Sequence, residues 1–319
     1  MVSVSRPLLS LMLLASCRPE TPTPTTIAPL VSEGYATTPD SVRLYYRVVG
    51  QASTTVMAPF ALFLGTALDS LAPEFRVVTY DPRGRGASDP VPREKISLDH
   101  LLTDLETVRR AVNAEQVAII GWSGGGMEMF VYALRNPGRV SRLVHLAPVA
   151  PRLNPYGGAM MADRAARTDS IAAARLRERI AAGVYSADSA GWCRAADSVS
   201  APALFAQPAS RPSTPDVCRF PNEYPDRLDQ YFGALFRSID GFDWRDSLPA
   251  VTIPRLVIHG AKDNTPLAGN LEWVVGQPNA RILVIEGAGH WPHYEQPRAS
   301  LAALVSFLRG GWPDGSVAR

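Results

Sequence analysis

The most constraining stretch of this sequence is an apolar run that leads directly into a glycine-rich turn. Residues 117–125 read Val-Ala-Ile-Ile-Gly-Trp-Ser-Gly-Gly, which contains the pattern G-x-S-x-G, and residues 127–134 have amphipathic helical spacing. The order is therefore strand, sharp turn, helix. A serine at such a turn takes a strained backbone conformation that only small neighbours tolerate, and its hydroxyl stands clear of the sheet edge. We therefore expect Gly121 and Gly125 to be needed on either side of Ser123.

Length and charge restrict the classes of protein that fit. A chain of 319 residues, 46% of them hydrophobic, suffices for one large α/β domain with an insertion or for two ordinary domains. The formal net charge is +2 and no run of Lys or Arg is interleaved with aromatic residues, so nothing predicts a nucleic-acid partner. No C-x-x-C or Cys/His spacing predicts a metal. We expect no cofactor.

The amino terminus has the pattern of an export signal. Residues 7–15 form an apolar run after a basic residue, too short to span a membrane and of the right length for a signal-peptide core. The run ends in Leu14-Ala15-Ser16-Cys17, which resembles the lipobox of bacterial lipoproteins and implies a lipid anchor on Cys17. An ordinary secretory signal with an incidental cysteine is the alternative. We expect a signal peptide over 1–16, a disordered tether over 17–31, and a protein of the cell envelope that meets the membrane only through this anchor.

The two remaining cysteines are Cys193 and Cys218. Because export leads to an oxidising compartment, they are candidates for a disulfide that would stabilise the fold by about 2–4 kcal/mol. Two buried free thiols are the alternative.

Strand and helix patterns alternate along most of the chain. The first two strands alternate apolar and polar residues, as in an antiparallel hairpin at a sheet edge. Alternation of the later elements implies a parallel sheet covered on both faces, with functional sites at the carboxyl ends of its strands. The expected strands cover 33–37, 42–50, 54–58, 76–80, 117–120, 140–146, 255–259 and 281–285, and the expected helices cover 61–71, 98–112, 264–275 and 299–308.

Five motifs together resemble the α/β-hydrolase superfamily. They are the amino-terminal hairpin, residues 77–88, the turn at Ser123, residues 256–263 and residues 287–292. The resemblance implies an α/β fold with a mostly parallel eight-stranded sheet and helices on both faces. It also implies a core over 32–150 and 248–311 with a mainly helical cap inserted at 151–247. Within the cap we expect helices over 160–182 and 228–239, and a proline-rich loop over 201–215.

Three residues in these motifs suit nucleophilic chemistry. A serine hydroxyl is a poor nucleophile at neutral pH, so it needs a general base and a third group that orients the base. We expect Ser123 to be the nucleophile, His290 the base and Asp263 the orienting acid. Weaker alternatives to Asp263 are Asp243 and Asp246. The other histidines are less suitable. His145 and His259 lie inside predicted strands, His100 lies at the start of a predicted helix, and His293 follows His290 by three residues.

A tetrahedral intermediate needs two N–H donors. Gly124, directly after the serine, would supply one. The second normally follows a His-Gly pair after the third strand, and this chain departs from that pattern with Ala58-Pro59-Phe60-Ala61. We expect the N–H of Phe60 or of Ala61 to replace it.

The cap suggests a substrate class. Residues 218–225 and 242–245 resemble the cap of proline-iminopeptidase-like members, which bind a free ammonium with cap carboxylates. The resemblance implies that Glu223 or Asp226 would contact such a group, solvated cap charges being the alternative, and we expect Trp122 to line the site.

The predicted activity is hydrolysis of a small ester or amide, including amino-terminal peptidase activity, through an acyl-enzyme. A carboxylesterase or lactonase is the first alternative, and the glycine-rich turn also resembles that of cofactor-free haloperoxidase-type hydrolases. Dehalogenase and epoxide hydrolase chemistry is disfavoured because it would place Asp where Ser123 stands. An alternative of another class is a non-catalytic binding protein on the same fold.

Overall fold

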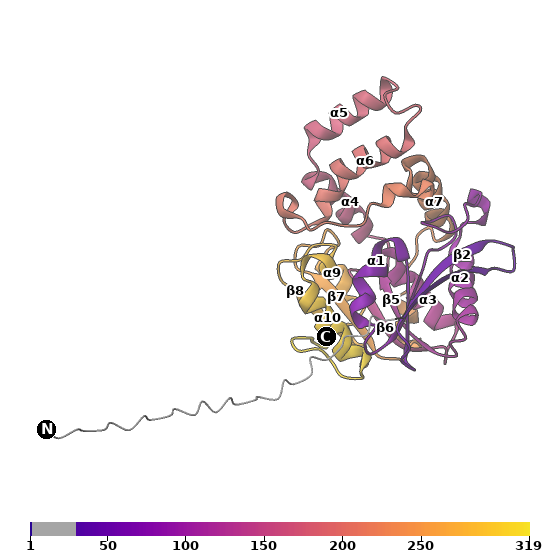
Figure 1. The fold of residues 1–319 in the computed structure, drawn as a ribbon, viewed down its shortest axis with the longest axis vertical. Helices are drawn as coiled ribbons and strands as arrows, with labels where there is room; N and C mark the ends of the chain where they lie inside the picture. Colours follow the sequence, from indigo (N-terminus) through magenta and orange to yellow (C-terminus); the bar gives the residue numbers. More distant parts are fainter. Residues whose placement is uncertain (2–29) are drawn as a thin grey trace.

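A computed structural model describes Met1 and residues 30–319 of the chain (Figure 1). Residues 2–29, which hold Cys17 and nearly all of the predicted signal peptide and tether, lie outside the described residues. The described part is built on one eight-stranded sheet with the strand order β1-β2-β4-β3-β5-β6-β7-β8.

The sheet confirms the predicted mostly parallel arrangement. Only the β1–β2 and β2–β4 pairs are antiparallel, and all other neighbours are parallel. The carboxyl ends of the parallel strands therefore share one edge, at which Ser123 directly follows β5. The strands are β1 (Val31–Thr37), β2 (Arg43–Val49), β3 (Thr55–Pro59), β4 (Arg76–Tyr80), β5 (Val117–Trp122), β6 (Val140–Leu146), β7 (Arg255–Gly260) and β8 (Ala280–Ile285).

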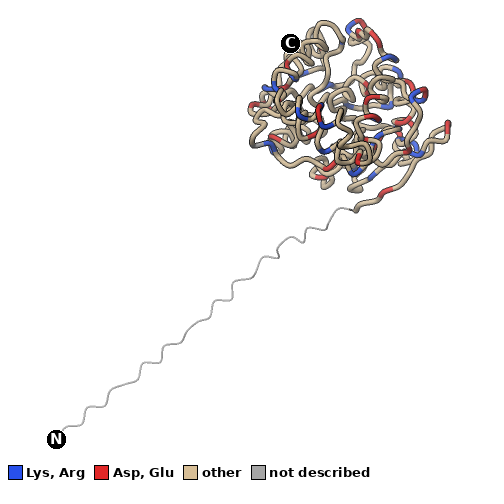
Figure 2. The backbone as a smooth tube through the Cα atoms, turned by 90° about the horizontal axis from the view of Figure 1, so that it is seen from above, with Lys and Arg blue, Asp and Glu red and all other residues tan. Residues whose placement is uncertain are grey.

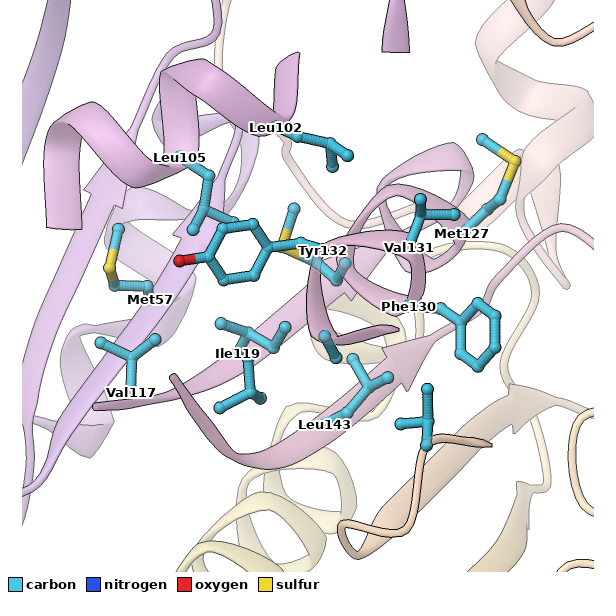
Figure 3. Close-up of a cluster of buried hydrophobic side chains, with 14 of the residues drawn as sticks. Met57, Leu102, Leu105, Val117, Ile119, Met127, Phe130, Val131, Tyr132 and Leu143 are labelled. Atoms are coloured by element: carbon cyan, nitrogen blue, oxygen red, sulfur yellow. The ribbon is translucent and has the colours of Figure 1, made fainter. Parts of the chain in front are cut away.

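Helices cover both faces of the sheet. Residues of α2 and α3 belong to one buried apolar cluster, and residues of α1 and α10 belong to another. Figure 3 shows part of the first cluster, where Phe130 and Tyr132 of α3 lie among Met57, Ile119 and Leu143 of the sheet. The core helices are α1 (Ala61–Leu68), α2 (Leu98–Ala111), α3 (Gly124–Arg135), α8 (Leu267–Leu271), α9 (Pro292–Glu295) and α10 (Pro297–Leu308).

The helix expected over 264–275 is shorter than predicted. It forms only as α8, which begins after Pro266, a residue that cannot donate a backbone hydrogen bond within a helix. Trp273 and Val274, whose spacing suggested a longer helix, lie in turns and are fully buried.

We call residues 151–247 the cap, because their helices lie beyond the carboxyl edge of the sheet (Figure 1). The chain leaves and rejoins the core at one place, where the N–H of Trp244 donates to the carbonyl of Pro151 and that of Leu153 to Phe242. The larger cap helices are α4 (Tyr156–Arg167), α5 (Ser170–Ala181), α6 (Ser189–Ser200) and α7 (Pro225–Ser238).

Two expectations for the cap need correction. The single helix expected over 160–182 is two helices, because Asp169 accepts hydrogen bonds from the N–H groups of Ile171 and Ala172 and so starts α5. The proline-rich stretch expected as a loop over 201–215 contains the short 3-10 helices η3 (Ala201–Leu204) and η4 (Pro208–Ser210), and Phe205 between them is 1% exposed.

A disulfide joins Cys193 of α6 to Cys218 of the 3-10 helix η5 (Val217–Arg219), with the two Cα atoms 5.7 Å apart. It closes a loop within the cap and ties α6 to the segment that leads into α7.

Charged residues of both signs are intermixed around the molecule (Figure 2). Within the described part of the chain, no helix combines the length and the apolar character that crossing a bilayer requires.

Candidate active site

Ser123 occupies the turn between β5 and α3 in a strained conformation, with φ 55° and ψ −125°. Its N–H donates to the carbonyl of Leu146 on the neighbouring strand, which fixes the turn to the sheet. A Cβ added to Gly121 would lie 2.2 Å from the carbonyl oxygen of Gly125, and one added to Gly125 would lie 3.4 Å from the ring of Phe60. Small residues are therefore needed here, most strictly at Gly121.

His290 lies in the loop between β8 and α9 and contacts both predicted partners. Its Nε2 is 2.9 Å from Ser123 Oγ, and its Nδ1 is 3.0 Å from Asp263 Oδ1. The imidazole and the carboxylate are buried, with side-chain exposures of 6% and 0%. Three side chains that are far apart in the sequence therefore form one hydrogen-bonded chain.

Asp263 follows β7 and is held by its own loop. Its Oδ1 also accepts a hydrogen bond from the N–H of Thr265 at 2.9 Å, while Oδ2 is buried without a partner among the described residues. With Nδ1–H of His290 donating to this carboxylate, Nε2 is left as an acceptor facing the serine hydroxyl. The arrangement can remove a proton from Ser123.

The alternative histidines take no part in this chain of contacts. His145 stacks on Trp273 with ring centroids 4.4 Å apart, and His259 contacts the side-chain nitrogen of Asn270 at 2.9 Å. Burial lowers the pKa of His293 to about 3, so this ring stays neutral. His100 contacts Ser97 at the start of α2.

The alternative acids also lie elsewhere. Asp243 forms an exposed ion pair with Arg245, with an oxygen–nitrogen distance of 2.6 Å, and Asp246 is exposed in the 3-10 helix that follows.

Two backbone N–H groups near the serine are unpaired. Gly124 begins α3, and Phe60 precedes α1 in a left-handed conformation, with φ 65° and ψ 57°. Within residues 30–319, neither N–H has a hydrogen-bond acceptor. The Phe60 ring packs against Gly125, so the two donors flank the same turn.

Asp81, which sequence reasoning did not single out, holds the Phe60 segment in place. Its Oδ1 accepts from the N–H of Leu62 at 2.9 Å, and its Oδ2 accepts from the N–H of Ala87 at 3.0 Å. Burial raises the pKa of this carboxyl to about 6. Asp81 thus ties the start of α1 to the loop after β4.

Trp122 does not line a substrate surface as expected. The side chain is buried, its Nε1 donates to the carbonyl of His290 at 2.9 Å, and its ring packs 4.2 Å from that of Trp291. The side chain of Trp122, the last residue of β5, faces the core. Through its contacts with His290 and Trp291 it supports the loop that carries His290.

The expectation that Glu223 binds a substrate ammonium is also wrong. The residue is 1% exposed, and its carboxylate accepts from Arg85 Nε at 2.9 Å, from Arg85 Nη2 at 2.8 Å and from the N–H of Gly86 at 2.9 Å. Arg85 neutralises the negative charge of Glu223, which a substrate ammonium group would need as its partner. The other candidate, Asp226, is exposed in the first turn of α7.

Glu295 is a further residue that the sequence reasoning missed, although it lies only five positions after His290. Its Oε2 accepts from the N–H of Gly289, and its Oε1 accepts from the N–H of Ala206 in the cap, both at 2.7 Å. The N–H of His290 itself donates to the carbonyl of Leu204 at 2.8 Å. A cap segment therefore braces the histidine loop directly.

The sequence profile described as "alpha/beta hydrolase fold" matches residues 60–297, which is more than half of the 319-residue chain. A 2-hydroxy-6-oxononadienedioate/2-hydroxy-6-oxononatrienedioate hydrolase of Cupriavidus pinatubonensis is 28% identical over 245 residues, covering 75% of this chain and 78% of the relative.

Solved structures show the same fold. A hydrolase from Pseudomonas aeruginosa superposes with a TM-score of 0.62 at 27% identity, covering 86% of this chain and 98% of that one. Proline iminopeptidase of Mycobacterium smegmatis superposes with a TM-score of 0.62 at 20% identity, covering 87% and 98%. Together with the strand–turn–helix unit at Ser123, these matches establish that the chain belongs to the α/β-hydrolase family and is an enzyme of the hydrolase class.

Proposed function

We propose that this hydrolase is a serine hydrolase that cleaves small carboxylic esters through an acyl-enzyme on Ser123. The observation that carries the proposal is the hydrogen-bonded chain from Ser123 Oγ through His290 to Asp263, at 2.9 Å and 3.0 Å. Both distances are within reach for proton transfer.

In this mechanism His290 Nε2 takes the proton of Ser123 as Oγ attacks the ester carbonyl carbon. Asp263 stabilises the resulting imidazolium. The imidazolium then donates its proton to the oxygen of the departing alcohol, as the bond between this oxygen and the acyl carbon breaks. Water enters, loses a proton to the same nitrogen and attacks the acyl carbon, which releases the acid and restores the serine.

The N–H groups of Gly124 and Phe60 are the proposed donors to the oxyanion. Both are free of acceptors among the described residues, and both flank the Ser123 turn. Preorganised donors of this kind contribute roughly 3–4 kcal/mol each to transition-state stabilisation. Phe60 thus takes the place of the donor that follows the His-Gly pair in the family's pattern.

Ester cleavage is favoured over amino-terminal peptide cleavage because neither predicted cap carboxylate suits an ammonium group, Glu223 being buried in an ion pair and Asp226 being exposed on α7. Glu223 is already paired with Arg85, so an ammonium group would have to displace a buried guanidinium. Ester hydrolysis, including that of a cyclic ester, needs no ammonium site. The same reasoning separates this chain from the proline iminopeptidase whose fold it shares.

We also propose that the enzyme works outside the cytoplasm, anchored through Cys17. The Cys193–Cys218 disulfide supports an oxidising compartment. Fractionation of cells that express the full chain or its Cys17→Ser variant tests the anchor: the full chain should sediment with membranes and the variant should not. Equal distribution of the two would contradict the anchor.

A fluorophosphonate probe tests the chemistry most directly. The folded protein should be labelled on Ser123, and labelling should disappear in Ser123→Ala and after heat denaturation. Turnover of 4-nitrophenyl esters should exceed that of aminoacyl anilides. A folded protein that neither reacts with the probe nor turns over any ester would instead indicate a non-catalytic binding protein.

A further inference from the structure

Helix α4 has one half-buried face and one exposed face. The exposed positions are small or apolar residues and bury nothing, and no residue of the helix is fully buried. The half-buried positions repeat at the spacing of a single helical face and are Tyr156, Gly157, Met160, Asp163, Arg164, Arg167 and Thr168.

Three residues of this face contact the core segment 262–272, which includes Asp263. The Tyr156 hydroxyl donates to Glu272 Oε1 at 2.7 Å, the Thr265 hydroxyl lies 3.7 Å from Met160 Sδ, and Arg167 Nη1 donates to the carbonyl of Lys262 at 2.6 Å. The half-buried face of α4 is therefore turned toward the loop that holds the acid of the hydrogen-bonded chain.

Arg164 lies on the same face, between two of these contacts. It is one turn beyond Met160 and three residues before Arg167, so its direction differs from that of Met160 by only about 40°. In Figure 1, α4 lies between α6 and the core, which places this face at the junction of cap and core.

Arg164 has no partner for its charge. Its guanidinium makes no hydrogen bond, ion pair or ring contact with any described residue, although the side chain is half-buried. Burial lowers the pKa of this guanidinium, which is still charged at neutral pH. An unpaired, partly desolvated cation is unfavourable unless something else supplies the counter-charge.

Two other arginines at the junction of cap and core are paired. Arg85 forms a bidentate ion pair with Glu223, and Arg152 forms one with Glu272. The charges of Arg85 and Arg152 are thus neutralised by carboxylates of the protein, whereas the charge of Arg164 is not.

We propose that Arg164 binds a carboxylate carried by the substrate, so that the preferred esters are half-esters of dicarboxylic acids. This rests on the proposed function, since it assigns a substrate class to the same site. The guanidinium fork matches the geometry of a carboxylate, and pairing would remove the unfavourable state of the free enzyme. Arg164 is a specificity-determining residue and takes no part in bond breaking.

The test compares two esters of equal chain length, mono-4-nitrophenyl glutarate, which carries a carboxylate, and 4-nitrophenyl pentanoate, which does not. In the wild type kcat/KM should favour the glutarate ester. In Arg164→Gln this preference should fall about 10- to 100-fold, mostly through KM, while kcat/KM for the pentanoate changes less than about two-fold. Arg164→Lys should keep part of the preference.

Arg175→Gln, which removes an exposed arginine from α5, is the matched control and should keep the full preference. An unchanged preference in Arg164→Gln would overturn the proposal, and so would an equal loss on both esters, because that loss would indicate a structural role.

A binding measurement separates this proposal from the proposed function. Calorimetry should show glutarate binding to the wild type at least about ten-fold more tightly than to Arg164→Gln, whether or not either ester is turned over. Equal binding to both proteins, or none to the wild type, would overturn the assignment of Arg164 even if ester hydrolysis is confirmed.

Discussion

The core and the cap of this hydrolase are held in different ways. In the core, Ser123, Asp263 and His290 are each fixed by backbone as well as side-chain hydrogen bonds, at the edge of a sheet whose strands β3, β5 and β7 are buried along their whole length. In the cap, α4 and α5 contain no fully buried residue. The three hydrogen-bonded side chains therefore belong to a tightly packed unit, whereas the cap helices α4 and α5 are only partly buried, and α7 joins the cap to the core through an apolar cluster.

The division has one exception, because the cap segment around Leu204 and Ala206 contacts the histidine loop. Glu295 bridges the two, and Phe205 stacks parallel to Trp291 with an interplanar angle of 5°. Displacement of this segment would break hydrogen bonds that hold the His290 loop. The cap therefore helps to hold the loop that carries His290.

The largest expected effect is on the core. Ser123→Ala or His290→Ala should lower kcat/KM for ester hydrolysis by about 10⁴-fold or more, because each removes the unit that generates the nucleophile. The double variant should be scarcely slower than either single variant. Steady-state kinetics on all three, with circular dichroism to verify folding, checks this, and multiplicative losses would argue against the assigned roles.

The second effect concerns the fastening of the cap. Glu223→Ala should lower the free energy of unfolding by about 3–5 kcal/mol, because it leaves Arg85 buried without its partner. Any loss of activity should be equal for ester and aminoacyl anilide substrates, since Glu223 contacts neither. Denaturant titration gives the stability, and Asp226→Asn, an exposed change on α7, should alter it by less than about 0.5 kcal/mol. A selective loss of anilide turnover would restore Glu223 as an ammonium ligand.

The disulfide sharpens the comparison further. Replacing Cys193 and Cys218 together with serine should reduce the free energy of unfolding by about 2–4 kcal/mol, because the unfolded chain gains conformational freedom. The loop that the bond closes includes Leu204 and Ala206, but these residues keep their own hydrogen bonds to the His290 loop, so kcat for a neutral ester should change little when the protein is folded. A loss of kcat as large as that of a core variant would show that cap and core cannot be separated in this way.

The smallest effect is a pH dependence in the core. Glu128 of α3 is 2% exposed, and burial raises the pKa of its carboxyl to about 7. The folded state then binds this proton more tightly than the unfolded state, so Glu128 lowers the free energy of unfolding progressively as the pH rises from about 4.5 to about 7.

Glu128→Gln should consequently be more stable than the wild type by about 1–3 kcal/mol at pH 8 and nearly equal to it at pH 4. Denaturant titrations of both proteins across this range measure the difference. A difference that does not vary with pH would mean that the carboxyl does not titrate as its burial indicates.

Much of the fold could be predicted because its signals are local. Apolar runs of β-branched residues predicted the strands. The glycines at 121 and 125 indicated a strained serine between them, since few larger residues would fit at these two positions. The order of elements and the family's motifs then led to the correct sheet. The helix break at Asp169 was missed because a capping aspartate interrupts a helical pattern without a glycine or proline.

The roles of individual side chains at the site depended on contacts that sequence patterns do not encode. Glu223 looked free in the sequence, and only the fold brings it to Arg85, 138 positions earlier in the chain. Trp122 follows Gly121 in a buried strand, and the packing of the His290 loop decided that its ring faces inward. Local sequence thus determined which residues could do chemistry. Tertiary structure decided which charges were already neutralised, because burial and pairing depend on residues that meet only when the chain has folded.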